Sequence, residues 1–269
     1  MLFDYHMHST FSADSKMKLD QICRQSIKVG LEEIAVTDHH DIDYQDPSIT
    51  FLIDKDEYLT TIEEYQAKYE GQLRIKKGLE LGLQAHILDQ CSEFVQDHFD
   101  FVIGSFHSAQ QKDLFTGQFF EGYSQWEAYR EYLKEVFYCV KKFDHFNVVG
   151  HLDVIRRYGD FSIVPDLMDD GECQDILDEI FKVLIHKGKG LEVNTSGYYI
   201  ADEKDPLPTR NVLKRYQELG GEILTTGSDS HYPEQLAYKF EETHHLLKSL
   251  GFKYLTTFDQ GEPTFHTIK

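Results

Sequence analysis

One helix-to-strand unit occupies residues 19–40, which read LDQICRQSIKVGLEEIAVTDHH. Apolar residues recur from Leu19 to Ile27 at the three- and four-residue spacing of a helix with one buried face. Gly30 follows at the position where a glycine commonly ends a helix. The next apolar run, residues 33–37, is typical of a strand buried on both faces, and two histidines follow it. This segment predicts a helix, a buried strand and imidazole side chains at the carboxyl end of that strand.

The same alternation of strands and helices continues along the chain. Helical spacing returns at residues 176–184 and 212–219, and Gly188 and Gly220 follow these segments as Gly30 follows the first. Segments that alternate in this way predict an α/β fold with a parallel sheet. We predict its strands at residues 2–5, 33–37, 73–79, 101–105, 147–150, 190–193 and 222–226.

The connecting segments contain no linker rich in Pro, Ser or Gly, so a single domain over residues 1–269 is the simplest interpretation. This length is slightly above the usual size of one α/β barrel, about 250 residues. Residues 41–60 and 109–124 are predicted to be long loops. Residues 252–258 are expected to form either a further strand or a terminal tail.

The composition disfavours several classes of partner. A formal net charge of −20 disfavours nucleic acid, whose phosphate backbone is bound through Lys and Arg. No run of about 18 apolar residues is present to span a membrane, and the N-terminus lacks the features of a signal peptide. We therefore expect a cytoplasmic protein; the sequence does not indicate its oligomeric state. We expect buried free thiols at the four dispersed cysteines, Cys23, Cys91, Cys139 and Cys173.

Side chains that can bind metal follow the predicted strands at equivalent positions. The strand-end positions from His8 to His151 are separated by 27 residues (Glu80 to His107) to 44 residues (His107 to His151), about the length of one strand–helix unit. In a parallel barrel all strands point their carboxyl ends to one face, where the active site lies. Six of the 14 histidines fall after predicted strands. The full set of candidate ligands is His6, His8, Asp14, His39, Glu80, His107, His151, Asp229 and His231.

These residue types predict a metal site, because imidazole suits borderline ions and carboxylate suits harder ones. Neither His6-Met7-His8 nor Asp229-Ser230-His231 alone is a specific sign of a metal site. The expected convergence of all these residues on one face of the barrel is a specific sign. The sequence leaves zinc, manganese, iron and cobalt open as the metal. His40 adjoins His39 and is a candidate substrate contact or proton relay, with support of the ligands as the alternative.

Short motifs surround these residues, in order along nearly the whole chain: His6-Met7-His8-Ser9, Thr37-Asp38-His39-His40, Gly78-Leu79-Glu80, Gly104-Ser105-Phe106-His107-Ser108, Gly150-His151-Leu152-Asp153, Leu191–Gly197 and Ser228-Asp229-Ser230-His231. They resemble the polymerase and histidinol phosphatase (PHP) superfamily, and within it the histidinol-phosphatase branch. The resemblance implies a distorted (β/α)7 barrel similar to a TIM barrel, with the active site at the carboxyl ends of the strands. It also implies a phosphatase that acts on L-histidinol phosphate in histidine biosynthesis.

The resemblance further implies three divalent metal ions. The first takes His6, His8, Glu80 and Asp229, the second shares Glu80 and adds His107 and His151, and the third takes Asp14, His39 and His231. The expected reaction is attack on phosphorus by a hydroxide that bridges the first two ions. Glu80, Asp229 and His231 are then catalytic as well as ligating. His231, His40 and a metal-bound water are alternative proton donors to the leaving alkoxide.

Substrate contacts are less well defined by the sequence. Arg156 and Arg157 suit a phosphate site, but adjacent side chains in a loop can point in opposite directions, so the sequence does not separate them. Asn194 and Ser196, at the end of the sixth predicted strand, are further candidates for substrate binding.

Two other functions remain open. Another phosphoesterase of the same superfamily (a phosphodiesterase, a nuclease-like enzyme or a phosphotyrosine phosphatase) would use the same ligands, although the acidic charge counts against long nucleic acids. A metal-stabilised but inactive subunit is expected to have lost ligands, whereas every ligand position is filled here. We therefore expect a small-molecule phosphomonoester as the substrate.

Overall fold

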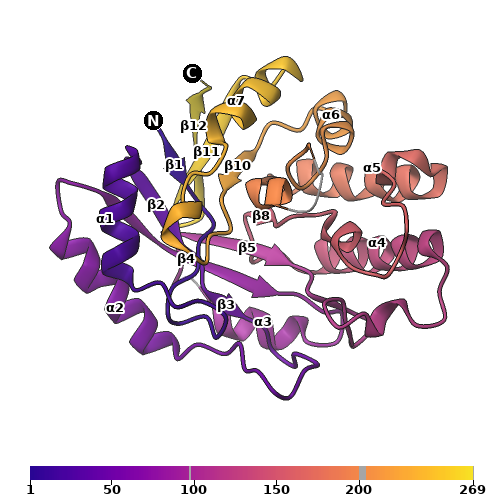
Figure 1. The fold of residues 1–269 in the computed structure, drawn as a ribbon, viewed down its shortest axis with the longest axis horizontal. Coiled ribbons are helices and arrows are strands. Elements are labelled where there is room, and N and C mark those ends of the chain that lie inside the picture. Colours follow the sequence, from indigo (N-terminus) through magenta and orange to yellow (C-terminus); the bar gives the residue numbers. More distant parts are fainter. Residues whose placement is uncertain (97, 200–203, 269) are drawn as a thin grey trace.

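The computed structural model describes residues 1–96, 98–199 and 204–268, and a sheet of parallel strands forms its centre (Figure 1). Seven strands follow one another in the order β1-β2-β4-β5-β8-β9-β10, and the short β3 continues the line of β2 along β4. The strands are β1 (Phe3–Asp4), β2 (Glu33–Val36), β3 (His39–His40), β4 (Arg74–Gly82), β5 (Phe101–Ser105), β8 (Val148–Val149), β9 (Gly190–Asn194) and β10 (Leu224–Gly227).

The first and last strands of this sheet meet, so the sheet is nearly closed. Tyr5 N donates a hydrogen bond to Thr226 O at 3.0 Å, and Met7 pairs with Ser230 in an isolated parallel bridge. The predicted distorted seven-stranded barrel is thereby confirmed. Closure also brings the residues after β1 beside the residues after β10.

The predicted strands are all present, with small shifts at their ends. β4 runs to Gly82, so Glu80 lies inside a strand instead of at its end. The loop predicted over residues 41–60 is wrong in its second half, where α2 (Lys55–Lys68) begins. Asp54 starts this helix because its carboxylate accepts a hydrogen bond from Glu57 N, a capping interaction worth about 1 kcal/mol.

Helices cover the outer face of the barrel (Figure 1). Gly30 ends the first helix in the left-handed conformation, with φ 85°, as predicted. The α-helices are α1 (Leu19–Val29), α2, α3 (Leu88–Val95), α4 (Gln125–Lys142), α5 (Gly171–His186), α6 (Arg210–Glu218) and α7 (Phe240–Ser249). Short 3-10 helices occur at Gln118–Phe120, Val154–Arg157, Leu167–Asp169, Thr195–Tyr199 and Pro233–Gln235.

Two hairpins extend this frame. β6 (Ser108–Ala109) and β7 (Lys112–Asp113) lie at the start of the predicted loop 109–124. β11 (Tyr254–Asp259) and β12 (Glu262–Thr267) form a C-terminal hairpin, so the segment 252–258 contains a strand instead of a tail.

The C-terminal hairpin packs at the end of the barrel where the strands begin. Phe258 stacks on Phe101 with the ring centroids 5.3 Å apart, and its N–H donates to the Tyr5 hydroxyl. That hydroxyl donates to Glu33 at 2.5 Å. The opposite end, where the strands finish, is left free for a site.

The interior contains the four cysteines, which are buried and free as predicted. Burial raises the pKa of the Cys23 and Cys91 thiols to about 12, so these groups are inert packing side chains. Among the described residues, no helix combines the length and the apolar character that a membrane span requires.

Candidate metal centre

The carboxyl ends of the strands bring the predicted ligands together. His39 in β3 pairs in register with Glu80 in β4, which places the two side chains at one level of the barrel. The other ligands come from the segments that follow β1, β5, β8 and β10, namely His6, His8, Asp14, His107, His151, Asp229 and His231.

Glu80 is the central carboxylate, and it is fully buried. Its Oε1 lies 2.9 Å from His151 Nε2 and 3.2 Å from His107 Nε2. Its Oε2 lies 3.1 Å from His6 Nε2 and 3.0 Å from His39 Nδ1. One carboxylate therefore faces imidazoles from four parts of the barrel, an arrangement suited to bridging two cations.

A first group of ligand atoms surrounds Glu80 Oε2. His6 Nε2 and His8 Nε2 lie only 3.1 Å apart. Asp229 Oδ1 lies 3.2 Å from His8 Nε2 and 3.6 Å from His6 Nε2. Two ring nitrogens at this distance repel through their lone pairs unless a proton or a metal ion lies between them. The ligand atoms of these four residues therefore have the spacing to hold one cation.

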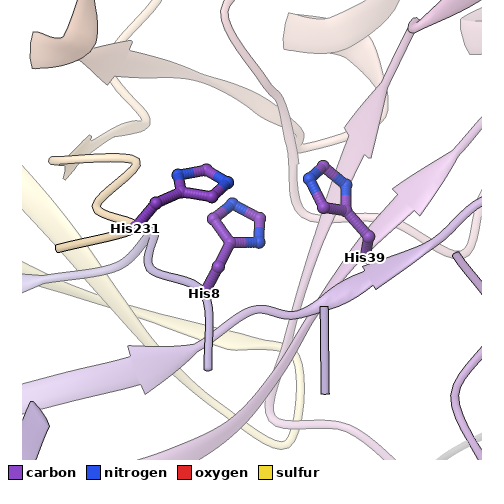
Figure 2. Close-up of side chains that lie close together, drawn as sticks. All are labelled: His8, His39 and His231. Atoms are coloured by element: carbon purple, nitrogen blue, oxygen red, sulfur yellow. The ribbon is translucent and has the colours of Figure 1, made fainter. Parts of the chain in front are cut away.

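A second group of ligand atoms, which includes His8, His39 and His231 (Figure 2), is less deeply buried, because the side chains of His231 and Asp14 are 22% and 36% exposed. His231 Nε2 is 3.1 Å from Asp14 Oδ2, and His39 Nε2 is 3.7 Å from the same oxygen. The ring of His8 stacks against both His39 and His231, with centroids 4.3 and 4.2 Å apart. These contacts hold the three imidazoles side by side beside the Asp14 carboxylate.

The cluster has the electrostatic character of a cation site. Glu80 Oε2 and His39 Nδ1 lie 3.0 Å apart without a hydrogen bond of regular geometry, and among the described residues the buried His151 Nδ1 has no hydrogen-bond partner. Burial lowers the pKa of His6, but neighbouring carboxylates, Glu192 foremost, outweigh it and raise that pKa well above its usual value. Because the field that favours a proton also favours a metal ion, the residues present fit divalent ions.

Two of the predicted ligands have backbone conformations that are uncommon for residues other than glycine. Asp229 has φ 54° and His151 has φ 21°. Such conformations persist where surrounding contacts fix them, and they cluster at functional sites. Here Asp229 N donates to His6 O at 2.8 Å, and His151 N donates to Glu192 Oε2 at 2.9 Å.

Two buried carboxylates behind the imidazoles were missed from the sequence. Asp41 Oδ1 lies 2.7 Å from His107 Nδ1, and Asp41 Oδ2 lies 3.3 Å from His39 Nδ1. Glu192 Oε1 lies 2.5 Å from His6 Nδ1. A charged residue within a buried apolar strand is rare unless it is paired, and this signal was available for Glu192. Asp41 lies in a segment predicted as loop, where an acidic residue is ordinary.

A pocket of about 390 Å³ opens onto the cluster. Cluster residues including Glu80, Asp229 and His231 line one part of it. Four aromatic side chains line another part, namely Tyr44, Phe51, Phe115 and Tyr158. Phe115 is 72% exposed, which is unusual for a large apolar side chain and places its ring at the entrance.

The structure separates the two adjacent arginines. Arg157 lines the pocket, its Nη2 donates to Ser196 Oγ at 2.7 Å, and its buried Nε has no hydrogen-bond partner among the residues that the structure describes. Arg156 donates instead to Pro165 O at 2.9 Å and to Asp153 Oδ2 at 3.3 Å. Arg157 is therefore the one of the two that faces the pocket, and Arg156 ties loops together.

His40 lies outside the residues that line the pocket. Its Nδ1 accepts a hydrogen bond from Ile53 N at 3.3 Å, and its ring stacks on Phe94 with the centroids 3.5 Å apart. The catalytic and substrate-binding roles predicted for His40 are not supported by this geometry, which favours a packing role.

Asn194 and Ser196, which were predicted as substrate contacts, are not among the described residues that line the pocket. Asn194 is fully buried, and its Nδ2 donates to Glu192 Oε2 at 3.1 Å and to Asp229 Oδ2 at 3.3 Å. Ser196 Oγ donates to Asp229 Oδ2 at 3.1 Å and accepts from Arg157. Both side chains orient residues of the site instead of lining the pocket.

Comparisons with known proteins identify the family that the chain is similar to. The PHP domain model matches residues 4–196. A histidinol-phosphatase from Lactococcus lactis subsp. lactis (strain IL1403) is 34% identical over 257 residues, which cover 95% of this chain and 93% of that protein. A probable histidinol-phosphatase from Thermotoga maritima is 28% identical over 94% of each chain.

A solved structure is similar over nearly the whole chain. The crystal structure of histidinol phosphate phosphatase from Lactococcus lactis, complexed with zinc, L-histidinol and phosphate, superposes with a TM-score of 0.87 at 32% identity and covers 98% of both chains. The chain therefore belongs to the PHP domain family and, within it, to the histidinol-phosphatases.

Proposed function

We propose that the protein is a metal-dependent phosphomonoesterase that hydrolyses L-histidinol phosphate to L-histidinol and phosphate. The observation that carries this proposal is that the ligand cluster and the Arg157 guanidinium share one pocket of about 390 Å³. A site of this kind combines cation sites with a fixed positive charge, as a dianionic ester requires. The zinc, L-histidinol and phosphate of the related Lactococcus structure support the choice of metal and substrate.

Three divalent ions are proposed, with zinc as the first candidate and manganese, iron and cobalt as alternatives. The carboxylate oxygens of Glu80 lie close to the Nε2 atoms of His6, His107 and His151, and these contacts support a Glu80 carboxylate that binds both of the first two ions. The proposed sets are His6, His8, Glu80 and Asp229 for the first ion, Glu80, His107 and His151 for the second, and Asp14, His39 and His231 for the third. When bound, such ions supply a water of lowered pKa and positive charge beside the phosphoryl oxygens.

The chain's own residues bind and orient the ester. Arg157 is proposed to bind the phosphoryl group through its pocket-facing guanidinium, and Ser196 holds that guanidinium in place. Ser196 Oγ also donates a hydrogen bond to Asp229, so hydrogen bonds connect the Arg157 guanidinium to the ligand cluster. His40 does not line the pocket, and His231 Nε2 faces Asp14 in the proposed site of the third ion, so a water molecule is proposed to protonate the leaving alkoxide.

The remainder of the pocket suits the amino-alcohol part of the substrate. Phe115 and Tyr158 contact each other with ring centroids 6.0 Å apart, and Tyr44 and Phe51 do so at 5.1 Å. Aromatic faces of this kind stack on a planar imidazole. Asp46 lies on the same lining and provides a negative charge for an amine. We further propose that the reaction serves histidine biosynthesis in the cytoplasm, where the buried free cysteines stay reduced.

The test is a substrate panel assayed on one metal-loaded preparation. L-histidinol phosphate should give a kcat/KM at least a hundredfold above phosphotyrosine, a sugar phosphate and bis(p-nitrophenyl) phosphate. Removal of metal with a chelator should abolish turnover, and added zinc or manganese should restore it. Preference for the diester or for phosphotyrosine would assign the chain to another activity of the same superfamily. Activity that survives complete metal removal would contradict the proposal as a whole.

A further inference from the structure

Glu192 lies in the middle of β9, and it is fully buried. It is a charged side chain between apolar neighbours, in a strand whose remaining residues are uncharged. A buried carboxylate is strongly unfavourable unless hydrogen bonds and opposite charges compensate for its lost hydration. Its partners therefore indicate what the residue does.

Those partners belong to two different ion sites. Glu192 Oε1 lies 2.5 Å from His6 Nδ1, on the side of the ring opposite to the nitrogen that faces Glu80. Glu192 Oε2 accepts from His151 N at 2.9 Å and from Asn194 Nδ2 at 3.1 Å. One carboxylate thus contacts a candidate ligand of the first ion and the backbone of a candidate ligand of the second.

The contact with His6 determines which nitrogen of that imidazole carries the proton and which is free to bind a metal ion. A carboxylate at Nδ1 holds a proton there, which leaves the lone pair on Nε2 directed toward Glu80 and His8. The contact with His151 N holds a residue whose φ of 21° is uncommon and is not maintained by chain preference alone. Both contacts fix geometry that the ions require before they bind.

The surrounding chain leaves room for this carboxylate. A Cβ atom at Gly227 would lie 2.3 Å from Glu192 Oε1 and 2.4 Å from His6 Cβ, so only glycine is accommodated there. Asn194 spans the remaining side, because its Nδ2 contacts both Glu192 and Asp229. The Glu192 carboxylate is thus surrounded by Gly227, His6, His151 and Asn194.

We propose that Glu192 is a positioning residue that sets the affinity of the first and second metal ions through His6 and His151, without touching the substrate. This inference rests on the metal centre of the proposed function but not on the identity of the substrate. Carboxylates behind ligating imidazoles typically change metal affinity 10- to 100-fold. The third ion, held by Asp14, His39 and His231, has no contact with Glu192 and should be unaffected.

The experiment measures zinc binding to metal-free protein by competition with a chromophoric chelator, with total zinc counted by mass spectrometry. Glu192→Gln keeps the shape of the side chain but removes its charge. The new amide NH₂ group also faces either His151 N or His6 Nδ1, and both of these atoms are donors themselves. We expect the affinities of the first two ions to fall at least tenfold and that of the third to stay within twofold. An Asp14→Asn background, which disables the third site, isolates the first two.

Glu33→Gln is the matched control, because Glu33 is also a buried carboxylate, but it bonds to Tyr5 at the other end of the barrel. It should leave all zinc affinities unchanged. Glu192→Asp is the second variant; it keeps the charge but withdraws the carboxylate by about one C–C bond, roughly 1.5 Å, and it should weaken the same two ions.

Thermal unfolding of each metal-free variant shows which of them is folded, and only the zinc affinities of folded variants are compared with the wild type. Affinities within twofold of the wild type in either folded variant would overturn the inference, as would an equal loss at all three ions. Because the readout is binding, a different preferred substrate would overturn the proposed function and leave this inference standing.

Discussion

Replacement of Glu80 by Gln is the most direct perturbation of the shared site. Gln has the same shape, so the barrel should remain folded, but one oxygen becomes an amide nitrogen that cannot bind a cation. The affected oxygens lie 2.9 Å from His151, 3.2 Å from His107 and 3.1 Å from His6. The substitution therefore acts on both of the ions that Glu80 is proposed to bridge.

The size of the effect follows from the loss of one charge. Two unit charges roughly 4 Å apart interact by about 4 kcal/mol at an effective dielectric constant near 20, which is a lower bound for a carboxylate and a divalent ion. A loss of this size for each ion corresponds to roughly a thousandfold weaker binding. At an ion concentration a hundred times the wild-type Kd, each ion stabilises the folded state by about 2.7 kcal/mol, and a thousandfold weaker Kd reduces this to under ~0.1 kcal/mol.

The assay compares thermal unfolding with and without zinc. In addition to the rise caused by the third ion, which Glu80 does not bind, the two shared ions contribute about 5 kcal/mol to the wild type, which at about 2 °C per kcal/mol raises its Tm by roughly 10 °C. Glu80→Gln should lose nearly all of that rise, and its turnover should fall by at least three orders of magnitude. Its Tm without metal should stay near that of the metal-free wild type, because the hydrophobic core is unchanged.

One result would refute the reasoning. If Glu80→Gln keeps the full zinc-dependent rise in Tm and near-normal turnover, the carboxylate is not shared between ions. Loss of the rise in Glu33→Gln, a buried carboxylate far from the cluster, would show that the assay reports general destabilisation instead of metal binding.

Three further predictions concern other parts of the site. Arg157→Ala should lower kcat/KM about 10- to 100-fold, the effect of one charged hydrogen bond. Arg156→Ala should mainly lower the free energy of unfolding, by about 1–3 kcal/mol. Equal losses of kcat/KM in the two variants would contradict the assignment of phosphate binding to Arg157. Gly82→Ala places a Cβ 1.9 Å from Asp41 Oδ1, so it should destabilise the fold by about 1–3 kcal/mol and weaken zinc binding, measured by unfolding and chelator competition. Burial lowers the pKa of His231, but Asp14 and Asp229 raise it to about 9 overall, so zinc must displace a proton there. Affinity at the third site should then rise about tenfold per pH unit from pH 7 to 9 and level off above; a flat profile would exclude this.

The ligands were predictable because a parallel barrel imposes one rule on all its strands. Each strand ends on the same face, so a histidine or acid after each of several strands can be assigned to one site without knowing any contact. The rule works for His107 and His151, whose positions in three dimensions follow from β5 and β8 alone. It also works for Glu80, although that residue lies inside β4, because β4 is longer than the others.

The same rule fails for side chains whose role depends on direction instead of chain position. Arg156 and Arg157 are adjacent in one 3-10 turn, and only the contacts with Asp153 and Ser196 separate them. His40 directly follows a ligand, yet it turns toward Phe94 because alternate residues of a strand point to opposite faces. Applied to the pair His39-His40, that alternation predicts that only one of them faces the cluster.

Two glycines indicate the positions of the supporting carboxylates that the pattern of ligand residues did not predict. Gly82 lies at the end of β4 and Gly227 at the end of β10, and a Cβ at either would strike a carboxylate behind the imidazoles, Asp41 or Glu192. Glycine weakens a strand through entropy and lost packing, so its presence in a buried strand indicates that another group approaches closely. A glycine next to a ligand position therefore predicts a supporting side chain whose identity the sequence leaves open. In this chain the two glycines locate the carboxylates that orient His107 and His6, and replacing either glycine should weaken metal binding as well as destabilise the fold.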